Sequence, residues 1–104
     1  MAIVGVAPGA RIVSLKVLDQ DGSGTIDNVI EAIQYASETI IKGQFDKTKC
    51  VINLSLGGFF NQRLNRTMVA AADQGIQFAV AAGNSGLDAD YFSPASSGDH
   101  ANIY

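Results

Sequence analysis

The sequence of 104 residues contains no tryptophan, and only one cysteine and one histidine. A single cysteine cannot form an intramolecular disulfide, so Cys50 does not indicate a redox compartment. Its place at the start of an apolar run predicts a small buried side chain. The sequence has no run of about 18 apolar residues, so we expect no membrane-spanning helix. Residues 1–10 lack a basic leader before an apolar stretch, and we expect no signal peptide in this chain.

Basic residues are also few. Seven Lys and Arg stand against ten Asp and Glu, which gives a net charge of -3. The basic residues are scattered, whereas nucleic-acid binding requires a basic face, so we expect no nucleic-acid partner. Apolar residues are abundant at 47% and glycines number 11, a composition typical of one globular domain at most.

The spacing of apolar residues predicts five elements in the order strand, helix, strand, helix, strand, over residues 11–18, 29–41, 50–56, 64–72 and 76–82. Asp27 is the expected N-cap of the first helix and Gly43 its C-terminal glycine cap, and Gly75 ends the second helix. The strands are continuously apolar, which indicates a parallel sheet buried on both faces. Residues 85–100 are expected to form a loop, and residues 101–104 the start of a further strand.

Two of these strands run directly into glycine. The run over residues 78–82 ends in Gly83-Asn84-Ser85-Gly86, and the run over residues 51–56 ends in Gly57-Gly58. The carboxyl ends of parallel strands share one edge of a sheet, and ligands bind at that edge in open α/β folds. We therefore expect the two junctions to lie side by side.

Read in order with the earlier segments Gly5-Val6-Ala7-Pro8-Gly9 and Lys16-Val17-Leu18-Asp19, these junctions resemble the subtilisin-like serine proteases, the subtilase or peptidase S8 family. The stretch over residues 91–96 resembles the proteinase K-like branch. The resemblance implies a three-layer α/β sandwich with a parallel sheet, of which residues 1–104 form only a part, between the family's catalytic His and Ser. It also implies that the triad lies outside this chain, that the isolated chain is inactive, and that His100 is a solvated loop residue.

The resemblance also assigns site residues. It makes Asn84 the side-chain donor of the oxyanion hole and places the substrate between two walls and beside a second binding edge. The first wall is Ser55, Leu56, Gly57 and Gly58, the opposite wall is Ala81, Ala82 and Gly83, and the second edge is Gly22, Ser23 and Gly24. Ile26 and Val29 lie either near a more distant apolar subsite or in the core.

The implied activity is that of a serine endopeptidase that cleaves peptide or protein substrates through an acyl-enzyme. The implied location is extracellular, and the remainder of the catalytic domain is the implied partner. No metal ligand is assigned and no cofactor is expected in this chain, although a structural calcium is compatible with the complete enzyme. The alternative is a truncated, non-catalytic fragment that binds peptides weakly at most. Such a chain is expected either to pair its first two strands directly or to be partly unfolded and prone to aggregate.

Two binding functions are less well supported. Gly22-Ser23-Gly24 follows a predicted strand as in a nucleotide-binding loop, but Asp27 stands where the third glycine is needed, and Asp19 and Asp21 would repel a phosphate. Asp88, Asp90 and Asp99 are candidate calcium ligands, but their spacing matches no regular calcium loop.

Overall fold

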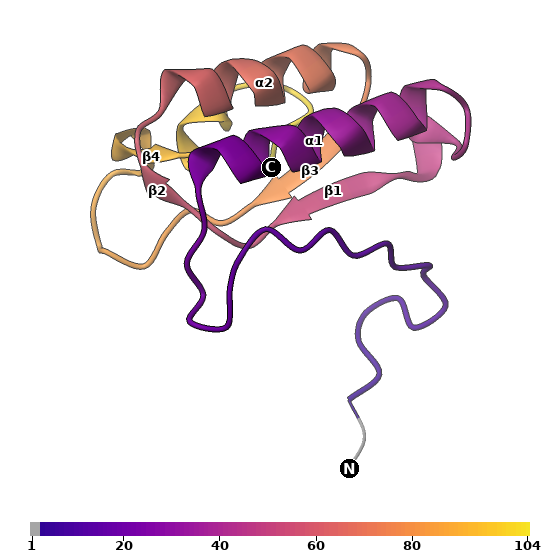
Figure 1. Cartoon of the computed structure of the whole chain (residues 1–104), viewed down its shortest axis with the longest axis horizontal. Helices are drawn as coiled ribbons and strands as arrows, with labels where there is room; N and C mark the ends of the chain where they lie inside the picture. The colour runs from indigo at the N-terminus through magenta and orange to yellow at the C-terminus, as the bar shows by residue number, and fades with distance from the viewer. Residues whose placement is uncertain (1–2) are drawn as a thin grey trace.

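The computed structural model describes residues 3–104 and places two helices side by side on one face of a parallel sheet (Figure 1). The helices are α1 (Ile26–Ile41) and α2 (Gln62–Asp73). Strand β1 (Val51–Leu54) pairs in parallel with β3 (Gln77–Val80). The alternation of helices with parallel strands is confirmed, and the described residues form a partial α/β domain.

The last residues of the chain extend this sheet on the free side of β3. Ile103 forms a parallel bridge with Phe78 and is only 2% exposed. The N–H of Val80 donates to the carbonyl oxygen of Tyr104 at 2.8 Å, and the N–H of Tyr104 donates to that of Phe78 at 3.0 Å. The start of a further strand at residues 101–104 is thus confirmed, and β3 is held on both edges.

Helix α1 begins earlier than its apolar stripe. Thr25 is the N-cap, and its hydroxyl accepts the N–H of Asn28 at 3.1 Å. The prediction of Asp27 as N-cap is therefore wrong: a cap must accept from an N–H two or three residues on, and Asp27 already lies inside the first turn. At the other end Gly43 follows the C-cap with φ +82°, as expected of a glycine cap.

Helix α2 has the same design. The side chain of its N-cap, Asn61, accepts the N–H of Leu64 at 3.0 Å. Gly75 follows the C-cap with φ +90°, which confirms the predicted end of the helix. The chain then turns directly into β3, so the C-terminal end of the helix is tied to the sheet on which it packs.

The core lies between the two helices and the sheet. Its buried apolar residues are Val29, Ile30, Ile33, Ile40, Leu54, Leu64, Met68, Ala71, Ala72, Ile76, Phe78 and Ile103. Cys50 packs against this cluster and is half-buried. The part of the chain that the structure describes contains no helix long and apolar enough to cross a membrane.

The predicted first strand does not form. Residues 11–17 have no secondary structure, and the segment runs below the sheet, away from the helices (Figure 1). A strand needs a neighbour for its N–H and C=O groups, and no strand pairs with this segment within residues 3–104. Ile12 and Val13 consequently stay 83% and 60% exposed. Direct pairing with β1, one branch of the hypothesis for the isolated chain, is excluded by this arrangement. The aggregation branch stays a prediction.

A second, small sheet is the main feature that the sequence did not predict. Strand β2 (Gly58–Phe59) pairs antiparallel with β4 (Phe92–Ser93), with Gly58 opposite Ser93 and Phe59 opposite Phe92. The expected loop also contains two short 3-10 helices, η2 (Ala89–Tyr91) and η3 (Ala95–Ser97). The residues after β3 are thus folded back against the residues after β1.

Candidate functional site

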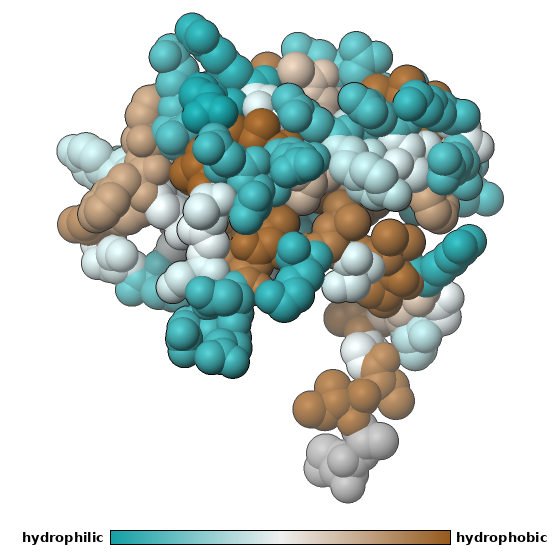
Figure 2. Space-filling view, in the orientation of Figure 1, coloured by the Kyte–Doolittle hydropathy of each residue, from teal (hydrophilic) through white to brown (hydrophobic). Residues whose placement is uncertain are grey.

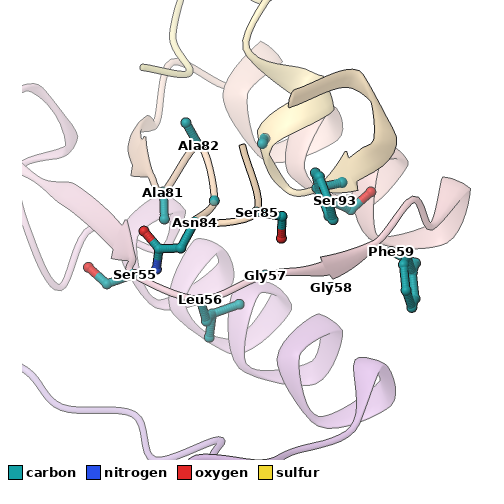
Figure 3. Close-up of a pocket in the computed structure, with 13 residues that line it drawn as sticks. Ser55, Leu56, Gly57, Gly58, Phe59, Ala81, Ala82, Asn84, Ser85 and Ser93 are labelled. Atoms are coloured by element: carbon teal, nitrogen blue, oxygen red, sulfur yellow. The ribbon is translucent and has the colours of Figure 1, made fainter. Parts of the chain in front are cut away.

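The carboxyl ends of β1 and β3 enclose a cavity of about 290 Å³ (Figure 3). Its lining comes from three segments of the chain. They are Ser55, Leu56, Gly57, Gly58 and Phe59 after β1, Ala81, Ala82, Gly83, Asn84 and Ser85 after β3, and Phe92, Ser93 and Ala95. The structure therefore brings together every residue predicted for the two walls, and it brings Asn84 to the same cavity.

The distance between the two walls is fixed where they begin, because the pairing of β1 with β3 continues one residue beyond Val80. The N–H of Ala81 donates to the carbonyl oxygen of Leu54 at 3.2 Å. Beyond this hydrogen bond the segments after β1 and β3 diverge, and the cavity opens between them (Figure 3). The parallel register of β1 and β3 thus determines where both walls begin.

The third side of the cavity is closed by the β2 and β4 ladder. At Gly57 a Cβ atom would lie 3.2 Å from the carbonyl oxygen of Ser93, which is tighter than ordinary contact. Glycine at this position therefore permits the close approach of the two segments. Ser93 is 1% exposed, and its hydroxyl accepts the N–H of Asn61 at 2.8 Å, so β4 is anchored to the start of α2.

Asn84 carries the polar group best placed to act on a ligand. It follows Gly83, whose φ of +106° is disfavoured for residues with a side chain. Figure 3 shows the Asn84 side chain between the two walls, with its amide toward the segment that carries Ser55. Within residues 3–104 the amide of Asn84 has no intramolecular hydrogen bond, whereas the hydroxyl of Ser55 accepts the Asn53 amide at 3.0 Å. The Asn84 N–H groups are free to donate to a bound molecule.

The cavity has no charged side chain in its lining. Its larger side chains are Leu56, Phe59 and Phe92, and its remaining polar groups are amides and hydroxyls. A charged side chain of a ligand would lose its hydration here without gaining an opposite charge. The lining therefore favours an uncharged, apolar group together with a few hydrogen bonds.

The predicted second edge lies outside this cavity. Gly22, Ser23 and Gly24 belong to an exposed turn in which the Asp19 carboxylate accepts the N–H groups of Asp21 and Ser23 at 2.9 and 3.0 Å. The turn amides that a phosphate would need are already bonded, which argues against a nucleotide loop. Participation of this turn in peptide binding stays a prediction.

Ile26 and Val29 follow the core interpretation. Val29 is 5% exposed within the main cluster, and Ile26 packs against that cluster partly buried. Neither residue lines the cavity after β1 and β3. A more distant apolar subsite built from these two side chains has no support in this arrangement.

His100 is not a solvated loop residue. Its Nε2 lies 2.8 Å from Oδ1 of Asp73, its Nδ1 accepts the N–H of Asn102 at 3.1 Å, and its side chain is only 20% exposed. No local pattern signals this contact, because Asp73 lies 27 residues away. The imidazole ties the last residues to the end of α2 and is not part of the cavity lining.

The acidic side chains named as candidate calcium ligands do not gather into one site. No group of three or more His, Cys, Asp or Glu side chains within residues 3–104 is arranged to hold a metal. Asp88 caps η2 by accepting the N–H of Asp90 at 3.0 Å, and Asp19 is committed to its own turn. We derive no step that involves a metal.

Five of the lining residues were not predicted: Phe59, Ser85, Phe92, Ser93 and Ala95. Phe59 directly follows the Gly57-Gly58 junction, so extending that junction by one residue would have found it, and Ser85 lies within the Gly83-Asn84-Ser85-Gly86 junction but was assigned to neither wall. Phe92, Ser93 and Ala95 reach the cavity through the β4 pairing, which no local pattern signals.

The amino-acid sequence of this chain is similar to those of known proteins. A family model described as the subtilase family, Peptidase_S8, matches residues 1–103. A subtilisin-like protease of Coccidioides posadasii (strain C735) is 47% identical over 92 residues, which is 88% of this chain and 23% of that protein. Cerevisin of Saccharomyces cerevisiae is 43% identical over 96 residues, 88% of this chain and 15% of that protein.

A solved structure has a similar fold. The crystal structure of a cold adapted subtilisin-like serine proteinase superimposes with a TM-score of 0.79 at 35% identity, covering 89% of this chain and 32% of that chain. The present chain thus spans less than a quarter of the length of the two relatives above and about a third of this solved structure.

Proposed function

The chain belongs to the subtilase family, and on that premise we propose that it forms part of a serine endopeptidase that hydrolyses peptide bonds through an acyl-enzyme. In this proposal the cavity after β1 and β3 binds the side chain of the residue before the scissile bond. The observation that carries the proposal is the unpaired Asn84 amide beside an uncharged cavity. A peptide or protein substrate and an extracellular location are part of the same proposal.

Asn84 would act on the oxygen of the scissile carbonyl. When a nucleophile attacks, this oxygen becomes negatively charged, and a donor that is already oriented stabilises the charge without reorganisation. An amide N–H fits this role because it is neutral and retains its donor at any pH at which the protein is folded. Its contribution is larger in the transition state than in the ground state, because a hydrogen bond to a charged oxygen is stronger than one to a carbonyl.

The segment after β1 would hold the peptide backbone. Within residues 3–104, Leu56 and Gly57 make no backbone hydrogen bond, so their N–H and C=O groups are available. An extended peptide can add to such a segment as a further strand, which gives affinity independent of the peptide's sequence. The cavity beside it then supplies side-chain selection.

The nucleophile and the base are not found among the cavity residues. The lining hydroxyls of Ser55, Ser85 and Ser93 have no histidine beside them in the cavity, and His100 is bonded to Asp73. This observation favours a second candidate, a fragment that binds peptides without cleaving them. In either case the same cavity binds the peptide, and only the first candidate predicts turnover.

The decisive experiment is the kinetic analysis of Asn84→Ala in the protein as its native source produces it. Removal of this donor from subtilisin itself lowers turnover about 100- to 1,000-fold, and we expect a loss of this order with KM nearly unchanged. Asn28→Ala is the matched control, because Asn28 is an exposed asparagine on α1 outside the cavity. A rise in KM with turnover intact would refute the oxyanion role, and absence of hydrolysis by the unmodified protein would favour the binding-only candidate.

A further inference from the structure

A network of polar groups joins the start of α2 to the segment that closes the third side of the cavity. The side-chain Nδ2 of Asn65 donates to the Ser96 hydroxyl at 2.7 Å, and the hydroxyl oxygens of Ser96 and Ser93 lie 3.4 Å apart. The Ser93 hydroxyl accepts the N–H of Asn61 at 2.8 Å and donates to the Asn61 carbonyl oxygen at 3.3 Å. Asn61 and Asn65 are four residues apart, so the start of α2 holds residues 93–96 at two points along one face.

The hydrogen bonds of this network run in one consistent direction. A serine hydroxyl has one hydrogen to donate and two lone pairs that accept. The Ser96 hydroxyl accepts from Asn65, which leaves its hydrogen to donate to Ser93, and the Ser93 hydrogen is directed to the Asn61 carbonyl oxygen. Ser93 is 1% exposed, and a buried polar network whose members are bonded in this way favours one arrangement of the segments that it joins.

The Asn65 side chain differs from its neighbours on α2. Gln62, Arg63 and Arg66 are exposed, and Figure 2 shows hydrophilic side chains projecting at the upper left, where Figure 1 places the start of α2. Asn65 is half-buried, and its Oδ1 is buried without a hydrogen-bond partner within residues 3–104. Asparagine is also a weaker helix former than alanine. Neither solvent contact nor helix propensity accounts for asparagine at this position, whereas its bond to Ser96 does.

This network reaches the cavity from outside. Ser93 and Ala95 belong to the lining, whereas Asn65 and Ser96 do not. Because η3 packs against α2 and begins at Ala95, a shift of Ser96 relative to α2 moves this part of the lining. Asn84 follows β3 and takes no part in these hydrogen bonds. A change at Asn65 therefore alters the shape of the cavity while the Asn84 amide stays in place.

We propose that Asn65 is a positioning residue of the substrate site, which holds η3 and β4 against α2 through Ser96 and thereby keeps the cavity in the shape that binds the peptide. This inference rests on the proposed function. Loss of a neutral hydrogen bond changes an equilibrium by about 2- to 12-fold. In Asn65→Ala the bonded arrangement of η3 should lose this factor in population relative to displaced arrangements, and peptide binding should weaken accordingly. Alanine favours the helix, so α2 itself stays formed.

The test measures kcat and KM of Asn65→Ala and Ser96→Ala with a slowly cleaved peptide, for which KM reports binding. We expect KM to rise about 2- to 12-fold in each variant with kcat nearly unchanged. The double variant should raise KM no further than either single variant, because both substitutions remove the same hydrogen bond. Ser96→Thr keeps the hydroxyl and should retain the KM of the unmodified protein.

Thr67→Ala is the matched control, since it removes a hydroxyl of α2 that donates to the Arg63 carbonyl oxygen at 2.9 Å within the same helix. We expect it to leave KM unchanged. An unchanged KM in Asn65→Ala, even with lower stability toward urea, would overturn the inference, as would an equal rise in Thr67→Ala or additive effects in the double variant. If the unmodified protein does not cleave the peptide, the proposed endopeptidase function fails. The dissociation constants of the same peptide for the same variants then decide on Asn65 by the same criteria.

Discussion

Gly83 offers a sharp test of how the backbone presents Asn84. Its φ is +106°, and a Cβ atom built on it would meet nothing within 4 Å. Gly58, on the opposite wall, has equally open space around an added methyl group but does not have a φ in the left-handed region. Gly83→Ala and Gly58→Ala therefore add the same group to the same cavity and differ in the backbone conformation that the alanine must adopt.

The expected difference in unfolding free energy between the two variants is found by removing the contributions that they share. Neither alanine meets a steric clash, so no packing cost enters. Both variants reduce the freedom of the unfolded chain by a similar amount, about 0.4–1 kcal/mol, and this stabilising contribution cancels in the difference. What is left is the strain of a non-glycine residue in a disfavoured region, about 1–3 kcal/mol. Gly83→Ala is thus expected to be less stable than Gly58→Ala by this amount.

Urea denaturation at 25 °C measures this difference. With a slope of about 1–3 kcal/mol per M, the midpoint of Gly83→Ala should lie roughly 1 M below that of Gly58→Ala at an unchanged slope. In the proposed endopeptidase, turnover should also fall in Gly83→Ala, because relief of the strain rotates the following peptide and moves the Asn84 amide. Equal midpoints would show that this glycine is not required for its φ, and an unchanged turnover would show that the φ of Gly83 does not position Asn84.

Two further predictions concern stability away from the cavity. Met68 is 0% exposed in the core, so Met68→Ala should lower the free energy of unfolding by about 2–5 kcal/mol in the same denaturation assay, and a loss under about 1 kcal/mol would contradict the packing described here. The side-chain and backbone hydrogen bonds from Thr48 lower the pKa of Asp46 from its usual value of 3.8, so these bonds stabilise the fold above that value and are lost as pH falls through the folded-state pKa. Thr48→Ala should raise the pKa of Asp46 toward 3.8 in an NMR titration, and an unchanged titration would refute the assignment.

The parts of the fold that the sequence predicted are those set by local patterns. Apolar stripes at helical spacing predicted both helices, and the glycines at positions 43 and 75 predicted where they end. Two continuous apolar runs predicted β1 and β3, and their glycine junctions predicted the two walls of the cavity. In each case the residues that give the signal are neighbours in the sequence.

The failures involve contacts that no local pattern determines. Residues 11–18 have the composition of a strand, but composition does not supply the neighbour that a strand requires. His100 lies beside Asp73 because α2, β3 and the final loop pack together, which no local pattern signals. The pairing of Phe59 with Phe92 likewise joins segments separated by a helix and a strand.

The cavity depends on both kinds of information, because its two walls are local features and its third side is not. In the observed register of β1 with β3, Leu56 and Ala81 both follow the carboxyl ends of their strands. They enclose a space, however, only because Ser93 is held at the start of α2 by its hydrogen bond to Asn61 and approaches Gly57 closely. The amide that would act on the reacting bond thus follows from a local feature of the sequence, whereas the third side of the cavity depends on contacts between distant segments. Substitution on the β4 side is therefore expected to change the shape of the cavity without altering the position of Asn84.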